Sequence, residues 1–147
     1  MLIRKAKLED LESLGVLFDA YRKFYGKQGD IIGAGIFIKE RLKNNDSEIF
    51  VAANEEDGVL MGFVQLYPLF SSTRMKRLWL LNDLFIDPGF RGKGISVALI
   101  NECKNLCNRT ASCGMILETA KDNIIANNLY LKTGFLPDKE HNFYEWG

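Results

Sequence analysis

The second half of the chain alternates between strand and helix patterns, and this alternation strongly limits the folds available to it. Residues 78–86 read as a central, buried strand that is apolar on both faces except at Asn82 and Asp83. A helix follows over residues 95–108, and residues 114–119 form another strand. A strand, a helix and a strand in succession imply two parallel strands joined by a crossover connection.

The first half of the chain has the patterns of helices and of antiparallel strands. Residues 2–6 predict a strand, and residues 11–24 carry apolar side chains at three- and four-residue steps, which is typical of an amphipathic helix. A second helix is expected over residues 30–43, with an aspartate as its N-cap. Residues 48–54 and 59–67 then predict a hairpin around an Asp-Gly turn.

The last part of the chain predicts a helix and a short closing hairpin. The helix covers residues 123–133, where Gly134 stands in the C-cap position, and the hairpin uses residues 135–137 and 143–146. We therefore expect a single domain over residues 1–147, of the α/β (α+β mixed) class. Its mixed antiparallel and parallel central sheet is flanked by about four helices, and a chain of this length can form one sizeable core.

Composition and charge exclude several function classes. Lys plus Arg and Asp plus Glu both number 19, so no net field favours nucleic acid or an anionic membrane as a partner. No run approaches the ~18 apolar residues of a membrane span, which predicts a cytoplasmic location. The 3 cysteines are expected to be reduced, with Cys103 and Cys107 on one helix face, and with His141 as the only histidine we expect no metal site.

Residues 86–96 have the features of a phosphate cradle. They leave a strand and enter a helix through glycines and two cations, and Gly92 and Gly94 would let an anion approach the helix N-terminus. A tight turn that uses glycine only for its dihedral angles is the alternative. A P-loop does not fit, since Ile95 stands where its lysine must be, and Val97 replaces the third glycine of a dinucleotide fingerprint.

Two motifs give the chain its resemblance to the GNAT superfamily of acetyl-CoA-dependent N-acetyltransferases. Arg91-Gly92-Lys93-Gly94-Ile95-Ser96 is similar to the family's pyrophosphate loop, with Ser96 where glycine or alanine is usual. Residues 123–135 match the family's Asn, Ala, Leu-Tyr and Gly-Phe spacing. On a helix, residues 123, 126, 127 and 130 form one stripe facing a groove, while Ile125 and Leu129 are expected to face the core.

The resemblance implies acetyl-CoA as the acetyl donor and no metal. The pantetheine arm would lie between two parallel strands that splay apart, bonded to the backbone of Leu84, Phe85 and Ile86 and to Asn123. The other residues that we expect at the coenzyme are Arg91, Gly92, Lys93, Gly94, Ile95, Ser96, Val97, Ala126, Asn127 and Tyr130.

The same resemblance implies roles in catalysis. Tyr130 would act as general acid beside the sulfur, and a main-chain N–H of residues 84–86 would stabilise the oxyanion. Asn82 stands where some relatives carry a glutamate base, so we expect it to hold a water that removes the amine's proton, with Glu118 as a possible acceptor. Asp83 is a further catalytic candidate, but it points to the opposite face unless a bulge intervenes, and a structural carboxylate is the alternative.

The expected acceptor is a primary amine: a polyamine, another small amine, or a lysine or N-terminus of a basic peptide. An aminoglycoside or an amino acid is a further possibility. Acidic residues that could line an amine groove are Asp83, Glu118, Glu140 and Glu145, although charged residues near strand ends are commonly just solvated. The resemblance also implies a homodimer.

Two other functions are consistent with the same motifs. A non-catalytic sensor of acyl-CoA with this fold is suggested by Asn82 and by the absence of an obvious base. A protein that binds nucleotide phosphates at the glycine turn is the other, and it predicts stabilisation by ATP instead of acetyl-CoA.

Overall fold

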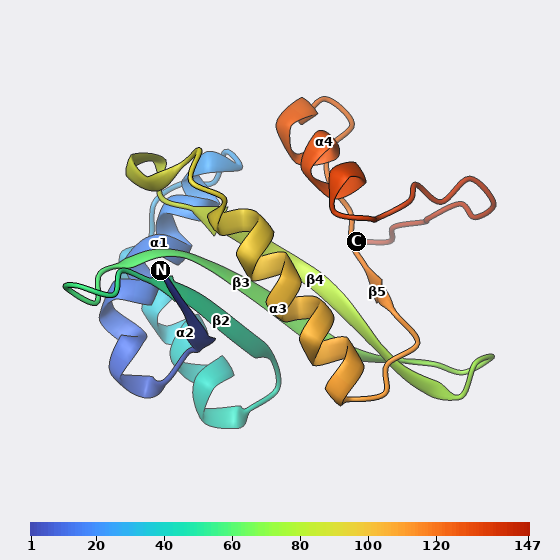
Figure 1. Ribbon diagram of the computed structural model, residues 1–147, viewed down its shortest axis with the longest axis horizontal. Helices are drawn as coiled ribbons and strands as arrows, with labels where there is room; N and C mark the ends of the chain where they lie inside the picture. The colour runs from blue at the N-terminus through green and yellow to red at the C-terminus, as the bar shows by residue number, and fades with distance from the viewer.

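The computed structural model describes all 147 residues, which form a five-stranded sheet with helices on both faces (Figure 1). The strands lie in chain order, and the first four are antiparallel neighbours, whereas the fifth pairs with the fourth in parallel. The strands are β1 (Leu2–Lys5), β2 (Glu48–Ala53), β3 (Leu60–Ser71), β4 (Lys76–Ile86) and β5 (Met115–Ile116). The helices are α1 (Leu11–Phe24), α2 (Ile31–Asn44), α3 (Ile95–Arg109) and α4 (Ile124–Lys132), and short 3-10 turns cover Leu8–Asp10 and Pro88–Phe90. The mixed sheet and the four helices confirm the predicted fold class.

Side-chain alternation along the strands separates two cores. Phe63 points to the face that α1 and α2 cover, where it packs with Leu14 and Ile38. Its neighbour Val64 points to the opposite face, which α3 crosses with Leu99 (Figure 1). All of these side chains are fully buried, so both faces of β3 are removed from water.

The predicted helix signals in the first half of the chain hold. Asp30 caps α2 by accepting a hydrogen bond from the main-chain N–H of Gly33 at 2.9 Å, and Asn45 ends the helix in the left-handed region at φ 51°. Gly58 has φ +75° in the turn between β2 and β3, as an Asp-Gly hairpin requires.

The predicted strand over residues 114–119 pairs only at its beginning. Met115 and Ile116 lie beside Trp79 and Leu80, and after this point β4 and β5 have no pairing between them. The interpretation of β4 as a central strand buried on both faces holds only in part: Phe85 packs in one core and Leu81 in the other, but the residues between the buried positions are only half-buried or exposed. It lies next to the edge of the sheet and alternates between buried and more exposed residues, because the open space beside β5 leaves part of it uncovered.

The predicted closing hairpin over residues 135–137 and 143–146 was also wrong. No strand follows α4, and the segment extends away from the sheet with Tyr144 90% and Trp146 99% exposed (Figure 1). The carboxylate of Asp138 accepts hydrogen bonds from the main-chain N–H groups of Glu140 and His141, so a local turn satisfies backbone groups that a hairpin would have paired with a strand.

All three cysteines are free, as predicted. Cys103 is buried and Cys107 partly buried against the same core, and burial raises the pKa of the Cys103 thiol to about 12. No helix has the combination of length and apolar character that crossing a membrane requires.

Candidate active site

The loop between β4 and α3 presents a row of unpaired backbone donors. The main-chain N–H groups of residues 91–97 donate no hydrogen bond within the protein, and the first helical bond of α3 runs from Ala98 to Gly94 at 3.1 Å. Gly92 and Gly94 both have φ +77°, a left-handed conformation that other residues adopt at a cost. Open N–H groups at a helix N-terminus, where the positive end of the helix dipole lies, favour an anion as a ligand.

Arg91 is held beside this loop by its own contacts. Its Nε donates to the carbonyl of Ile86 at 3.1 Å, and its guanidinium lies 5.4 Å from the ring centroid of Phe24 and 5.5 Å from that of Phe85. The cation–π contacts and the hydrogen bond fix the position of the cation while leaving its charge uncompensated by any carboxylate.

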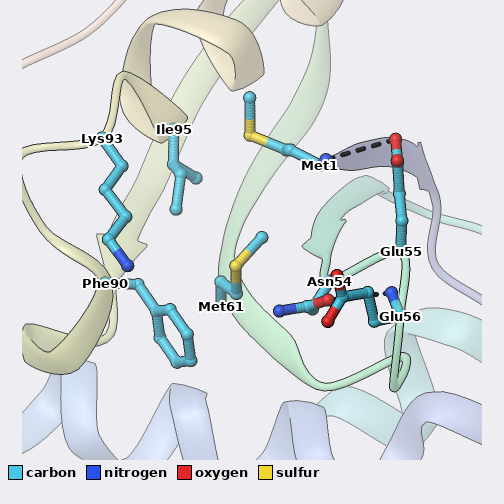
Figure 2. Close-up of a pocket in the computed structure, with 8 residues that line it drawn as sticks. All are labelled: Met1, Asn54, Glu55, Glu56, Met61, Phe90, Lys93 and Ile95. Carbon is cyan, nitrogen blue, oxygen red and sulfur yellow. Dashed lines mark hydrogen bonds and ion pairs between the residues drawn. The ribbon is translucent and has the colours of Figure 1, made fainter.

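Lys93 takes a different direction from Arg91. Its side chain lies 5.4 Å from the ring centroid of Phe90 and lines a separate hollow of about 320 Å³ on the other side of the start of α3 (Figure 2). The N-terminal amine of Met1, paired with Glu55 at 3.2 Å, lies on the far wall of this hollow. Of the expected coenzyme residues, Lys93 therefore presents its main-chain N–H with the other open donors of the loop, while its side chain lies in this separate hollow.

The outer edge of β4 is open beyond Leu80. The N–H of Asp87 donates to Met61 on β3 at 2.9 Å, and the antiparallel alternation then turns the backbone groups of Phe85 toward β3. The groups of Leu84 and Ile86 face away from β3, into the space beside β5. Of the three residues whose backbone was expected to bond the pantetheine arm, Leu84 and Ile86 thus have N–H and C=O groups open to this space. Phe85 lines the site but has its backbone groups turned toward β3.

Helix α4 supplies the opposite wall. The side-chain oxygen of Asn123 accepts from the N–H of Ala126 at 3.1 Å and so caps the helix, while its amide nitrogen has no partner. Asn127 donates its amide to the carbonyls of Ala120 and Asn123 at 3.0 and 2.8 Å, which stabilises the preceding loop. The expectation that Ile125 faces the core was wrong: it is 85% exposed, because α4 lies beyond the edge of the sheet instead of over its face.

Tyr130 is a partly buried side chain of α4 that packs against the core on the α3 side of the sheet. Its ring packs edge-on against Phe135 at 5.6 Å between centroids, and burial raises the pKa of its hydroxyl to about 12. The hydroxyl has no hydrogen-bond partner within the protein and is not sealed from the surface. It is therefore a protonated donor at neutral pH with a free proton to give.

Two cavities meet at this tyrosine. The first, which we call the loop cavity, has a volume of about 420 Å³ and lies between the 91–97 loop, β4 and α4; it is lined by Arg91 and Lys132 and by no carboxylate. The second, the strand cavity, has about 750 Å³ and lies between β4 and β5. Both are lined by the side chains of Tyr25, Leu84 and Tyr130. A ligand that fills the loop cavity would end where the strand cavity begins.

The expected coenzyme residues lie around the loop cavity with two exceptions. Its lining residues among them are Leu84, Phe85, Ile86, Arg91, Gly92, Gly94, Ile95, Ser96, Val97, Asn123, Ala126 and Tyr130. Lys93 and Asn127 do not line it, for the reasons given above. The stripe expected on α4 is therefore present at residues 123, 126 and 130 only.

A bulge in β4 brings Asn82 and Asp83 together. The register shifts so that Leu81 and Asp83 have partners on β3 while Asn82 has none. The amide nitrogen of Asn82 donates to Asp83 Oδ1 at 3.0 Å, which leaves the amide oxygen of Asn82 without a partner at the strand cavity.

Asp83 itself is enclosed. It is 4% exposed, accepts from Gln65 Nε2 at 2.7 Å, and lines neither cavity. Ser47 donates in turn to Gln65 at 2.9 Å, so the carboxylate ends a buried chain of polar groups. Burial raises the pKa of Asp83, and the hydrogen bonds from Gln65 and Asn82 oppose this shift. This geometry favours the structural role for Asp83 over direct contact with a substrate.

The other acidic residues that were expected to line an amine groove do not lie together at one cavity. Glu118 is exposed and lines the strand cavity, whereas Glu140 and Glu145 lie on the exposed C-terminal segment and line neither cavity. No group of three or more His, Cys, Asp or Glu side chains could hold a metal ion.

Sequence reasoning missed the contribution of α1 to the site. The apolar face predicted for residues 11–24 includes Tyr21 and Phe24, and the end of this helix reaches the cavities, where Tyr21 lines the strand cavity and Tyr25 lines both. The hydroxyl of Tyr21 donates to the carbonyl of Asn82 at 3.4 Å. The aromatic cluster at the end of the helix was the available signal, but only the tertiary packing shows what it faces.

Comparison with known proteins places these features among acetyltransferases. Residues 14–135 match the model of the acetyltransferase (GNAT) family. The uncharacterized N-acetyltransferase YhfO of Bacillus subtilis (strain 168) is 41% identical over 138 residues, which are 94% of this chain and 91% of that protein. A probable acetyltransferase of Haemophilus influenzae is 33% identical over 83% of each chain. A crystal structure of a probable acetyltransferase superposes with a TM-score of 0.96 at 35% identity, covering 100% of this chain and 97% of the other.

Proposed function

This chain belongs to the GNAT family and is an N-acetyltransferase, and from this premise we propose that it moves an acetyl group from acetyl-CoA to a primary amine at the junction of its two cavities. The observation that carries the proposal is that the loop cavity and the strand cavity share Tyr130. The proposed catalytic unit spans residues 1–147 as one domain.

The chemistry of the loop cavity fits an anionic coenzyme. The free N–H groups of residues 91–97 and the cation of Arg91 would hold a diphosphate, and the unpaired amide nitrogen of Asn123 would bond the pantetheine arm. When bound, acetyl-CoA supplies an acetyl thioester. The outward-facing N–H groups of Leu84 and Ile86 are the donors available to its carbonyl oxygen.

In the proposed reaction the acceptor nitrogen bonds to the acetyl carbon while the carbon–sulfur bond breaks. Tyr130 donates its hydroxyl proton to the departing sulfur, which its raised pKa permits because the hydroxyl stays protonated at neutral pH. The proton that the amine loses passes to a water held by the free amide oxygen of Asn82, with Glu118 in the same cavity as the final acceptor. The proton that left Tyr130 is restored from solvent.

Asp83 is proposed as a positioning residue. Its hydrogen bond from the Asn82 amide nitrogen turns the amide oxygen of Asn82 toward the strand cavity. Gln65 and Ser47 hold the carboxylate in place in turn. The role thus depends on orientation and not on direct proton transfer.

Replacing Tyr130 by phenylalanine tests the proposal. Purified protein with acetyl-CoA and a panel of amines should release free thiol, and Tyr130→Phe should lower kcat by ~10²-fold or more because the proton donor is lost. The melting shift caused by acetyl-CoA should stay close to that of the wild type, since the loop cavity retains its other contacts.

Two further tyrosines provide controls. Tyr144→Phe, on the exposed C-terminal segment, should leave kcat unchanged. Tyr25→Phe removes the other hydroxyl at the junction, so a large loss in that variant with none in Tyr130→Phe would assign the acid to Tyr25. Coenzyme binding without thiol release from any amine would instead favour an acyl-CoA sensor.

A cytoplasmic location and a homodimer are further proposals. The exposed aromatic side chains of the C-terminal segment, including Phe143 and Trp146, support an association between copies of the chain. Sedimentation of the purified protein measures the oligomeric state directly.

A further inference from the structure

The two cavities differ in charge, and this difference bears on the acceptor. The loop cavity carries the cations of Arg91 and Lys132, whereas the strand cavity contains no Lys or Arg and a single carboxylate, that of Glu118. The other carboxylate nearby, Asp83, is sealed beneath the surface with its oxygens bonded to Gln65 and Asn82. The strand cavity therefore offers one site for a positive charge.

The remaining wall of the strand cavity is apolar. The residues of this wall come from β4, from the end of β5 with the residue after it, and from the C-terminal segment: Leu80, Leu81, Leu84, Ile116, Leu117 and Phe143. A second ammonium group placed against this wall would lose water without gaining a partner, which is costly. An aliphatic or aromatic body placed there would gain from burial.

The polar groups of the strand cavity come from both of its walls. The amide oxygen of Asn82, without a partner in the protein, and the hydroxyl of Tyr21 belong to the β4 wall, while Glu118 comes from the opposite strand segment. Tyr130 lines the junction with the loop cavity. An amine nitrogen held by these groups would leave the rest of the molecule among the leucines and Phe143.

We infer that the acceptor is a small monoamine whose single ammonium group is attached to an apolar body, of the arylalkylamine class. This inference rests on the proposed function and narrows its acceptor. A cavity of about 750 Å³ has room for an aromatic ring, whereas polyamines and aminoglycosides carry several ammonium groups for which one carboxylate is too few. A lysine-rich peptide has the same excess of positive charge.

A comparison of four acceptors tests this inference. The full-length protein is given acetyl-CoA with 2-phenylethylamine, spermidine, kanamycin or a lysine-containing basic peptide, and kcat/KM is measured by thiol release. We expect kcat/KM for 2-phenylethylamine to exceed that for each of the others by ~10-fold or more, since an additional ammonium group finds no partner on the apolar wall. The melting temperature with each amine alone should rise most with 2-phenylethylamine.

A carboxylate added to the apolar wall of the strand cavity tests whether the number of negative charges there selects the acceptor. Ile116→Asp places a second carboxylate in the strand cavity and should raise kcat/KM for spermidine while lowering it for 2-phenylethylamine. Ile124→Asp makes the same substitution at an exposed position that lines neither cavity, and it should change neither value. Circular dichroism on both variants checks that they are folded.

The outcomes separate this inference from the proposed function. A preference of the wild-type protein for spermidine, kanamycin or the peptide would overturn the monoamine class and leave the acetyltransferase intact. Thiol release from none of the amines, with acetyl-CoA bound, would overturn the proposed function and this inference together.

Discussion

At the scale of single residues, the surroundings of two buried carboxylates shift their pKa values in opposite directions. Asp83 is buried beneath the strand cavity, where desolvation raises its pKa. Asp10 is also nearly buried, but Arg4 forms a two-pronged hydrogen bond with it at 2.8 Å to each oxygen, and this contact lowers its pKa. The sign of each shift follows from whether a cation is present to compensate for lost water.

Asp10→Asn tests the stabilising pair away from the site. Asp10 also accepts from the N–H of Lys7 at 2.9 Å, so it connects β1 to the start of α1. We expect the substitution to lower the free energy of unfolding at pH 7 by about 2 kcal/mol, the size of a hydrogen bond to a charged group. Urea unfolding measures it, with Asp57→Asn in the exposed hairpin turn as a control for the charge change.

The pH dependence of the same pair has a definite sign. Because the folded-state pKa of Asp10 is lowered, its contribution is complete above the unfolded value of about 4 and is lost as the pH falls through the folded pKa. The difference in stability between wild type and Asp10→Asn should therefore shrink below pH 4. A difference that stays constant down to pH 2 would contradict the assignment.

At the scale of elements, the site depends on what happens where β4 ends. The loop from β4 to α3 contains two glycines in the left-handed region, and the first helical hydrogen bond of α3 is donated by the N–H of Ala98. On its other side β4 loses its neighbour after Leu80. These two interruptions of regular structure create the anion site and the space beside it.

Gly94→Ala should weaken acetyl-CoA binding. An alanine at φ +77° costs about 1–2 kcal/mol, and relief of this strain would move the free N–H groups. We expect the dissociation constant, measured by calorimetry, to rise by ~10-fold. The added methyl itself meets nothing within 4 Å, so a steric clash is not the cause.

Gly35→Ala is the matched control for that variant. Gly35 lies inside α2, its added methyl group also meets nothing within 4 Å, and its φ is not positive. It should leave coenzyme binding unchanged and raise stability by about 0.5–1 kcal/mol, because alanine is the better helix former. If both substitutions weakened acetyl-CoA binding equally, the proposal that the 91–97 loop binds the coenzyme would be wrong.

At the scale of the whole molecule, the centre of the sheet is packed between two cores, whereas α4 at the β5 side is not. Helices α1 and α2 with one core, and α3 with the other, hold β2, β3 and β4 rigidly. Helix α4 lies at the β5 side with no buried residue of its own, joined to α3 by the hydrogen bond from Lys104 to the carbonyl of Thr133 (Figure 1). A ligand in the loop cavity would contact both β4 and α4 and so join this helix to the central part of the sheet.

Acetyl-CoA should therefore stabilise the whole protein. At 100 times its dissociation constant it should add ~2.7 kcal/mol to the free energy of unfolding, which is several degrees in melting temperature for this size. ATP at the same concentration should shift the melting temperature less, because it cannot extend along the open edge of β4 to Tyr130. An equal or larger shift with ATP would favour a nucleotide-phosphate protein.

The sequence by itself determined the features that depend on near neighbours in the chain. The periods of α1 and α3, the cap at Asp30 and the glycine loop at residues 91–96 follow from local sterics and hydrogen bonding. The motif at residues 123–135 led to the tyrosine at the junction of the cavities. Each of these features depends on residues close together in the chain, so the sequence predicts it without knowledge of the fold.

Only the tertiary structure decided the features that depend on distant partners. The bulge at Asn82 arises from the pairing of β4 with β3, and the exposure of Ile125 from the position of α4 beyond the sheet. The hairpin predicted after residue 135 needed a strand to pair with, and no strand lies there. Pairing and burial are set by residues far apart in the chain, and for that reason periodicity alone could not predict them.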